Sequence, residues 1–254
     1  MTAADQYLGE VVRKYAVVCG VGSPAPTAAM SLEPVLRSWA GGYLLDLGLS
    51  GSYAKGTAIS LGTDVDLFVS LAHAAGPSMK DIYWNLMRRL ESSQFHPEAQ
   101  NVSIGVRIGG VRVDVVPGRK QLGHSSDHTL YRRKANTWTQ TNVEQHIRLI
   151  AESGWQDEIR ALKIWRQRRR LDFPSFYLEL TVLDALKGRR PGHQAVNIRC
   201  VLEYLRDAFV DAVVVDPANS NNRISEDLEP QQKRLIANAA SMALAARRWE
   251  EILW

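Results

Sequence analysis

Residues 51–69 read GSYAKGTAISLGTDVDLFV, and a second apolar stretch, VRVDVVPG, covers residues 111–118. Asp64 and Asp66 stand two residues apart in a stretch that alternates like a β-strand, so we expect both carboxylates on one face of it. Asp114 lies among valines, where a charge needs a partner or a metal ion. Three carboxylates on rigid neighbouring strands would form the all-oxygen site that Mg²⁺ prefers.

A glycine-serine pair precedes the acidic strand. Gly51 and Ser52 follow the apolar stretch YLLDLGLS, and a glycine turn lets backbone N–H groups approach a polyphosphate, with the Ser52 hydroxyl as a further donor. Two Mg²⁺ ions, or Mn²⁺ in their place, held by all three aspartates would activate an attacking hydroxyl and stabilise the leaving pyrophosphate. The pattern therefore predicts nucleotidyl transfer from a nucleoside triphosphate. Nearby, Lys55 has two interpretations, a phosphate contact or a solvated loop lysine, and Thr57 is expected to cap the short helix.

GSYAKGT followed by TDVDLFV resembles the DNA polymerase β nucleotidyltransferase superfamily. Within it, the chain resembles the branch of 2′-5′ oligoadenylate synthases, cyclic GMP–AMP synthase, bacterial CD-NTases and archaeal-type CCA-adding enzymes. The segment EIRALKIWRQRRRLDFPSFYLELTVLDAL is similar to the two-helix segment of that family. By this resemblance Lys163 and Ser175 would hold the triphosphate, and Phe176, where the family often has Tyr, would stack on a base. The late segment VVVDPANSNNRISEDL resembles the loop before the last helix of CD-NTases and oligoadenylate synthases.

The resemblance and the hydrophobic pattern predict an α+β protein. A polymerase β-like lobe, with a mixed sheet and flanking helices, would occupy residues 1–140, and a helical lobe would occupy residues 141–254, with the active site in the cleft between them. Gly109 and Gly110 predict a tight hairpin turn before the strand that carries Asp114. We expect strands at 43–50, 63–72, 102–108 and 111–116, a polar stretch at 118–141, and helices at 1–18, 30–41, 78–95, 143–153, 156–170, 175–188, 194–215 and 230–254.

Three functions are compatible with these features. The first is a CD-NTase, which joins nucleoside triphosphates into a cyclic or linear oligonucleotide that signals to an effector, as in anti-phage defence. The second is a template-independent terminal transferase that extends an RNA or DNA end, for which the basic cluster at residues 166–170 offers a nucleic-acid contact. The third is a catalytically silent nucleotide sensor, and the three intact carboxylates argue against it. Base choice, linkage, ring closure and oligomeric state have no signature in the sequence.

Composition sets broader bounds. The 254 residues carry a net charge of +4, which suits a polyphosphate or nucleic-acid ligand. No apolar run reaches the ~18 residues of a membrane span, and the N-terminus lacks the apolar core of a signal peptide, so we expect a cytoplasmic protein without membrane contact. Cys19 and Cys200 lie too far apart for a metal motif, and His124 and His128 fall in a polar loop that does not predict a zinc site.

Overall fold

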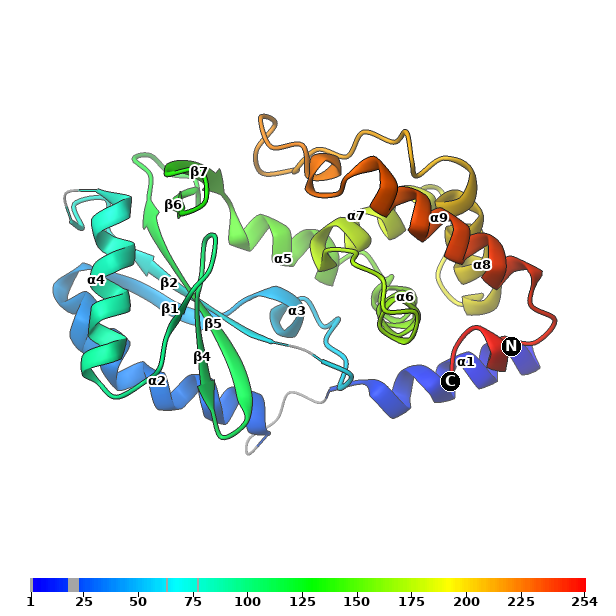
Figure 1. The fold of residues 1–254 in the computed structure, drawn as a ribbon, viewed down its shortest axis with the longest axis horizontal. Helices are drawn as coiled ribbons and strands as arrows, with labels where there is room; N and C mark the ends of the chain where they lie inside the picture. Colours follow the sequence, from blue (N-terminus) through cyan, green and yellow to red (C-terminus); the bar gives the residue numbers. More distant parts are fainter. Residues whose placement is uncertain (1, 18–22, 63, 77) are drawn as a thin grey trace. The chain divides into compact units, whose positions relative to one another are not determined.

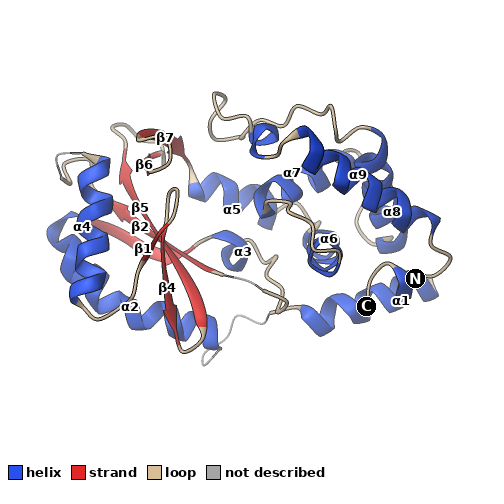
Figure 2. Ribbon diagram, viewed as in Figure 1, coloured by secondary structure: helices blue, strands red, loops and turns tan. Residues whose placement is uncertain are grey.

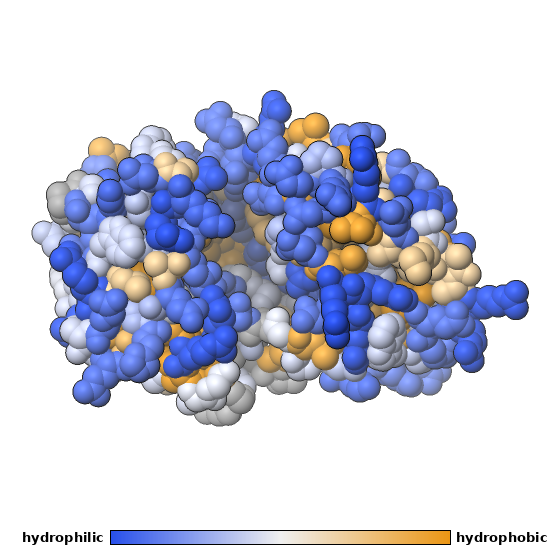
Figure 3. Space-filling model, viewed as in Figure 1, coloured by the Kyte–Doolittle hydropathy of each residue, from blue (hydrophilic) through white to orange (hydrophobic). Residues whose placement is uncertain are grey.

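The computed structural model describes residues 2–17, 23–62, 64–76 and 78–254 (Figure 1). The chain divides into two compact units. The sheet unit comprises Val18–Lys55 and Thr63–Arg148, and the helical unit comprises Met1–Val17, Gly56–Gly62 and Leu149–Trp254. On the face shown in Figure 3, hydrophilic residues dominate and apolar ones form small separate patches. Among the described residues, no helix combines the length and the apolarity that a bilayer span requires.

The sheet unit is built on one mixed sheet within the described residues (Figure 2). The strands run in the order β1-β2-β5-β4-β3, and β6 and β7 extend the sheet from β5. β2 and β5 are parallel, whereas the other neighbours are antiparallel. The strands are β1 (Leu44–Leu49), β2 (Val65–Leu71), β3 (Glu98–Ala99), β4 (Ile104–Ile108), β5 (Val111–Lys120), β6 (His128–Arg132) and β7 (Thr137–Thr141).

Two helices cover one face of this sheet, α2 (Pro24–Ala40) and α4 (Met79–Ser92) (Figure 1). Their apolar residues form one core with alternate residues of β2 and β5, such as Val65 and Val113, both fully buried. The helix α4 begins where expected, because the Ser78 hydroxyl accepts a hydrogen bond from the Asp81 backbone N–H at 3.1 Å. The opposite face of β2 and β5 carries both polar and apolar residues, among them Asp66, Asp114 and Phe68. The shorter helices here are η1 (Gly41–Tyr43) and α3 (Gly51–Ala54).

The helical unit packs around a second apolar core, in which Trp165 and Leu162 of α6 are buried. The rings of Phe173, Tyr177 and Phe209 pack there edge-to-face or tilted, with centroids 5.1–5.3 Å apart. The unit contains α1 (Ala3–Tyr15), α6 (Gln156–Arg168), α7 (Ser175–Ala185), α8 (Gln194–Asp207), η2 (Ile224–Asp227), α9 (Pro230–Ala245) and η3 (Trp249–Glu251), while α5 (Val143–Ala151) begins in the sheet unit.

The structure follows most of the expected pattern, with several differences. The hairpin turn has positive φ at both Gly109 (55°) and Gly110 (83°), as predicted. The helix α2 starts earlier than residue 30, because proline is well tolerated in a first helical turn. The stretch 118–141 was expected only to be polar, and in the structure it forms the end of β5 together with β6 and β7. The last two long helices end earlier than expected, at Asp207 and Ala245.

The units also differ from the expected lobes. The sequence places a boundary at residue 140, whereas the helical unit resumes at Leu149. The first helix groups with the helical unit rather than with the sheet, because Leu8, Val11 and Val12 are buried in the helical core. The stretch between the expected helices 1–18 and 30–41 lies partly in residues 18–22, outside the described residues.

Candidate active site

The face of the sheet opposite α2 and α4 carries two of the three predicted aspartates. Asp66 on β2 and Asp114 on the parallel strand β5 are direct Cα partners, so their side chains leave the sheet on the same side. Asp64 lies immediately before β2, two residues from Asp66. The sequence alternation and the strand register therefore bring the predicted residues to one place, which we call the acidic face.

Gly51 lies directly against Asp66. A Cβ atom added to Gly51 would stand 1.7 Å from Asp66 Oδ2, and its φ of +56° is in the left-handed region. The backbone N–H of Ser50 donates to the Asp66 carbonyl at 2.8 Å, which fixes the start of α3 beside the strand. Ser52 is the second residue of α3 and is half-buried. Glycine is thus required here by the carboxylate, a reason that the sequence motif alone did not provide.

Two polar residues that sequence analysis missed hold Asp114. Gln100 Nε2 donates to Asp114 Oδ1 at 2.6 Å, and Arg112 Nε lies 3.3 Å from the same oxygen. Arg112 Nε also lies 3.6 Å from Asp64 Oδ2, so one guanidinium stands between two of the carboxylates. Arg112 precedes Asp114 by two residues, and the same alternation could have found it. Gln100 has no such signal, because it lies outside a regular strand.

The environment of Asp64 reflects crowding of negative charge. Partial burial raises its pKa above the ordinary value, and the neighbouring Asp114 raises it further. The guanidinium groups of Arg112 and Arg107 act in the opposite direction, yet the net shift remains upward. The acidic face is therefore a place where additional positive charge would be stabilised.

The donor set has the chemistry of a divalent-cation site, since carboxylate oxygens are the ligands that Mg²⁺ prefers. Asp66 and Asp114 are neighbours in register, and Gly51 leaves space at the Asp66 carboxylate. In the described part of the chain, however, no three Asp, Glu, His or Cys side chains gather around one ion position, and Asp64 faces Arg112 instead. The carboxylates are suitable ligands for the ion. Asp64 would have to give up its contact with Arg112 in order to bind the metal.

In the helical unit, Lys163 has a protein partner. Its Nζ donates to Glu179 Oε1 at 2.6 Å and to Thr57 Oγ1 at 2.9 Å, and the side chains of Lys163 and Glu179 are only 3% and 1% exposed. Thr57 also donates to Glu179 at 2.9 Å. The expected capping role of Thr57 is therefore wrong, because its hydroxyl joins this buried network. Lys55 is buried as well, at 7% exposure, so its interpretation as a solvated loop lysine is wrong.

Ser175 and Phe176 open α7, as the resemblance implies. The Ser175 hydroxyl is exposed and accepts a hydrogen bond from Arg166 Nη1 at 3.0 Å, while the same nitrogen donates to the Phe173 carbonyl at 2.7 Å. Phe176 is half-buried against the helical core. Burial lowers the pKa of Arg166. Arg166, which sequence analysis treated only as part of a basic cluster, therefore orients the start of this helix.

Other arginines of the basic cluster pack against aromatic rings. The Arg168 guanidinium lies 5.4 Å from the Tyr15 ring centroid and 5.3 Å from that of Trp254. Arg169 lies 5.6 Å from the Trp254 centroid. These cation–π contacts stabilise the helical unit and occupy charges that were considered for nucleic-acid contact.

The late loop is closed by its aspartate. Asp216 accepts hydrogen bonds from the Ala218 backbone N–H at 2.9 Å and from Asn222 Nδ2 at 3.1 Å, and it is 5% exposed. The Asp-Pro-Ala-Asn sequence therefore forms an internally bonded turn.

No protein-family model and no curated protein matches this sequence. Solved structures do match. The CD-NTase CdnG of Bradyrhizobium diazoefficiens, solved with GTP, superposes with a TM-score of 0.80 at 14% identity over 96% of this chain and 91% of CdnG. This chain has the fold of the CD-NTases. CdnC of E. coli MS115-1, solved with a HORMA protein, gives 0.76 at 18% identity over 96% and 90% of the two chains.

The Cid1 poly(U) polymerase matches with a TM-score of 0.70 at 12% identity, over 96% of this chain and 95% of Cid1. The CD-NTases and Cid1 both have the polymerase β-like nucleotidyltransferase fold, so the predicted fold class is confirmed. Within the CD-NTase fold of this chain, the acidic face lies on the central parallel strands β2 and β5.

Proposed function

We propose that the protein is a nucleotidyltransferase of CD-NTase type, which joins nucleoside triphosphates into a cyclic or linear oligonucleotide. The observation that carries this proposal is the register of Asp66 with Asp114, with Gly51 making room for the first carboxylate. A downstream effector that responds to the product, and a role in anti-phage defence, belong to the same proposal.

The aspartates would act together on the reacting phosphate. Asp64, Asp66 and Asp114 would hold Mg²⁺, as two ions or with Mn²⁺ in their place, and the bound metal would supply Lewis-acid stabilisation of the reacting phosphate. Asp114 is fixed through Oδ1 by Gln100, so its other carboxylate oxygen would accept the proton of the attacking hydroxyl. Arg112 would release Asp64 when the site is loaded.

Five residues would contact the nucleotide. Backbone N–H groups at Gly51 and Ser52 would hold phosphate oxygens. At the start of α7, Ser175 would contact phosphate and Phe176 would stack on a base. Lys163 would bind the triphosphate only if its ion pair with Glu179 were broken.

Bound nucleotides in similar proteins support this proposal. CdnG was solved with GTP, and CdnE of Elizabethkingia meningoseptica, described as a cyclic dinucleotide synthase, was solved with GTP and Apcpp.

A terminal transferase is the second candidate, favoured by the similarity to the Cid1 poly(U) polymerase. The packing of Arg168 and Arg169 against Trp254 counts against it, because those charges are engaged within the helical unit. A short RNA would therefore be a poorer acceptor than a free nucleotide.

Product analysis separates the two candidates. The purified protein is incubated with all four labelled ribonucleoside triphosphates and Mg²⁺, with and without RNA, and products are resolved by chromatography and mass spectrometry. We expect pyrophosphate and a short oligonucleotide with phosphatase-resistant internal phosphates, made without RNA. Elongated RNA alone would favour the terminal transferase, and no turnover would reject both candidates.

A further inference from the structure

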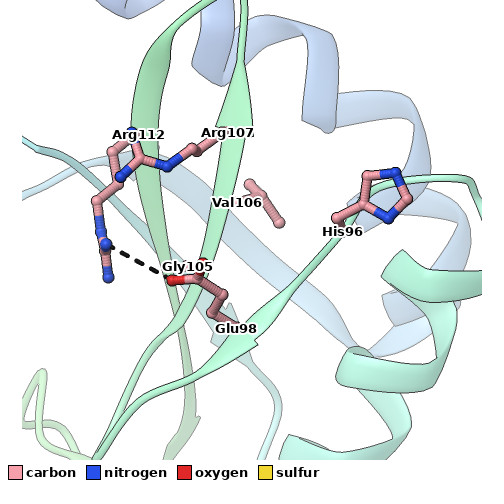
Figure 4. Close-up of a pocket in the computed structure, with 6 residues that line it drawn as sticks. All are labelled: His96, Glu98, Gly105, Val106, Arg107 and Arg112. Carbon is pink, nitrogen blue, oxygen red and sulfur yellow. Dashed lines mark ion pairs between the residues drawn. The ribbon is translucent and has the colours of Figure 1, made fainter.

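Beside the acidic face, two arginines form a cross-strand pair. Arg107 on β4 and Arg112 on β5 are direct Cα partners, and Arg112 shares its face of β5 with Asp114. Figure 4 shows both side chains on the same side of the two strands. They line a pocket of about 200 Å³, and its lining residues are His96, Glu98, Gly105, Val106, Arg107 and Arg112.

Arg112 has carboxylate partners within the protein, whereas Arg107 forms no ion pair among the described residues. Like charges directly opposite each other on a sheet are destabilising unless something neutralises them. Arg112 faces Asp114, Asp64 and, at 3.7 Å, Glu98. The exposed Arg107 side chain forms no hydrogen bond or ion pair with any residue that the structure describes. Its guanidinium therefore presents its N–H donors to a ligand, and a phosphate group matches that fork of donors.

The pocket adjoins the carboxylate that would receive the acceptor hydroxyl. Gly105 lines the pocket and is the Cα partner of Asp114, and a Cβ added to Gly105 would stand 3.1 Å from Asp114 Oδ1. Along the sheet, Gly51 lies beside Asp66 on β2, whereas Arg107 lies on β4, beyond β5. The glycine turn therefore lies on the β2 side of Asp114, Arg107 lies on the β4 side, and Arg112 lies on β5 itself.

We propose that Arg107 and Arg112 bind the phosphate groups of the acceptor nucleotide, while the Gly51 side takes those of the donor. This inference rests on the proposed function and assigns the second substrate of the same site. Glu98 does not prevent it, because its side chain is 67% exposed and its pair with Arg112 is a weak surface interaction.

Calorimetric titration tests this assignment without relying on turnover. The protein is titrated in Mg²⁺ with the α,β-methylene analogues of the four ribonucleoside triphosphates, singly and in pairs. We expect two bound equivalents in the wild type. Arg107→Ala should weaken one equivalent by at least about tenfold and leave the other unchanged, since a charge-assisted hydrogen bond is lost. Arg107→Lys should retain part of the affinity.

Arg88→Ala is the matched control, because Arg88 is an exposed arginine of the same unit, on α4, and does not line the pocket. It should leave both equivalents unchanged, and equal melting temperatures of all variants would show that they are folded. Two unchanged equivalents in Arg107→Ala, or equal weakening of both, would overturn the inference while leaving the proposed function intact. A short RNA is titrated in the same way; if Arg107→Ala weakens only the binding of RNA, the pair binds nucleic acid and the inference is overturned. A wild type that binds no nucleotide would overturn both proposals.

Discussion

The charged side chains of the two units differ in exposure and in how fully they are paired. On the sheet, the Asp64 side chain is 54% exposed and shares Arg112 with Asp114, so negative charge is only partly neutralised. In the helical unit, Lys163 and Glu179 are almost fully buried and bind each other and Thr57. Sequence analysis assigned the aspartates to Mg²⁺ and Lys163 to the triphosphate. The structure indicates that the first set is open to a ligand and that the second is already satisfied by the protein.

This difference predicts that mutations in the buried pair change stability, whereas mutations on the acidic face change ligand binding and turnover. Removing one partner of a buried pair leaves an uncompensated charge in the core and lowers the free energy of unfolding. Removing a partly solvated carboxylate from the acidic face has a smaller effect on folding, and its effect should be on ligand binding and turnover.

The largest effect is expected for Glu179→Ala, which leaves the Lys163 ammonium buried without its carboxylate. The free energy of unfolding should fall by about 3–5 kcal/mol, measured by urea denaturation. Replacing both partners, Lys163→Met with Glu179→Leu, should recover most of that loss. Glu33→Ala is the control, because Glu33 pairs with Arg37 on the surface and should change stability by less than about 1 kcal/mol. Equal losses in Glu179→Ala and Glu33→Ala would contradict the distinction between the units.

Asp66→Asn should reduce turnover by about 10²–10³-fold, because it removes a charge from the site where the transition state is stabilised. Pyrophosphate release measures turnover, and urea denaturation should give nearly wild-type stability. The matched control is Asp46→Asn, an exposed aspartate on β1 of the same sheet. Turnover equal to that of the control would remove Asp66 from the site.

Gly51→Ala tests whether the backbone beside Asp66 must be glycine. A methyl group would collide with Asp66 Oδ2 and would also stand at a φ of +56°. We expect a stability loss of about 1–2 kcal/mol, together with reduced pyrophosphate release because the carboxylate is displaced. Gly48→Ala serves for comparison, since no atom lies within 4 Å of its added Cβ. Equal rates of pyrophosphate release by Gly51→Ala and Gly48→Ala would show that the contact between Gly51 and Asp66 does not matter for activity.

A smaller, pH-dependent effect is expected at Asp5 in the helical unit. Backbone hydrogen bonds from Ala195 and Thr2 lower its pKa to about 2. Because the folded-state pKa is depressed, this carboxylate stabilises the fold above about pH 4, and that contribution is lost as the pH falls toward 2. Asp5→Asn should cost about 1 kcal/mol at neutral pH through the weakened helix cap, and should unfold with a flatter acid dependence. Denaturation curves recorded between pH 2 and 7 would show this, and identical slopes would refute it.

The sequence predicted the strands that carry Asp66 and Asp114 and the glycine turn before β5, because strand alternation and hairpin turns depend on local rules. It did not predict that Gly51 makes room for Asp66, because that contact depends on how β1 and β2 pair. The same limit applies to Lys163, whose partner Glu179 lies on another helix. The strands β6 and β7 were missed because their sequence is polar and gains its alternating burial only from the sheet.

Divalent-cation binding tests the central claim most directly. Electron paramagnetic resonance of added Mn²⁺, recorded for the wild type, Asp66→Asn and Asp46→Asn, reports whether the carboxylates of the acidic face share an ion. We predict Mn²⁺ bound by the wild type and by Asp46→Asn, and lost from Asp66→Asn. Equal Mn²⁺ binding by all three proteins, or none by the wild type, would contradict the account.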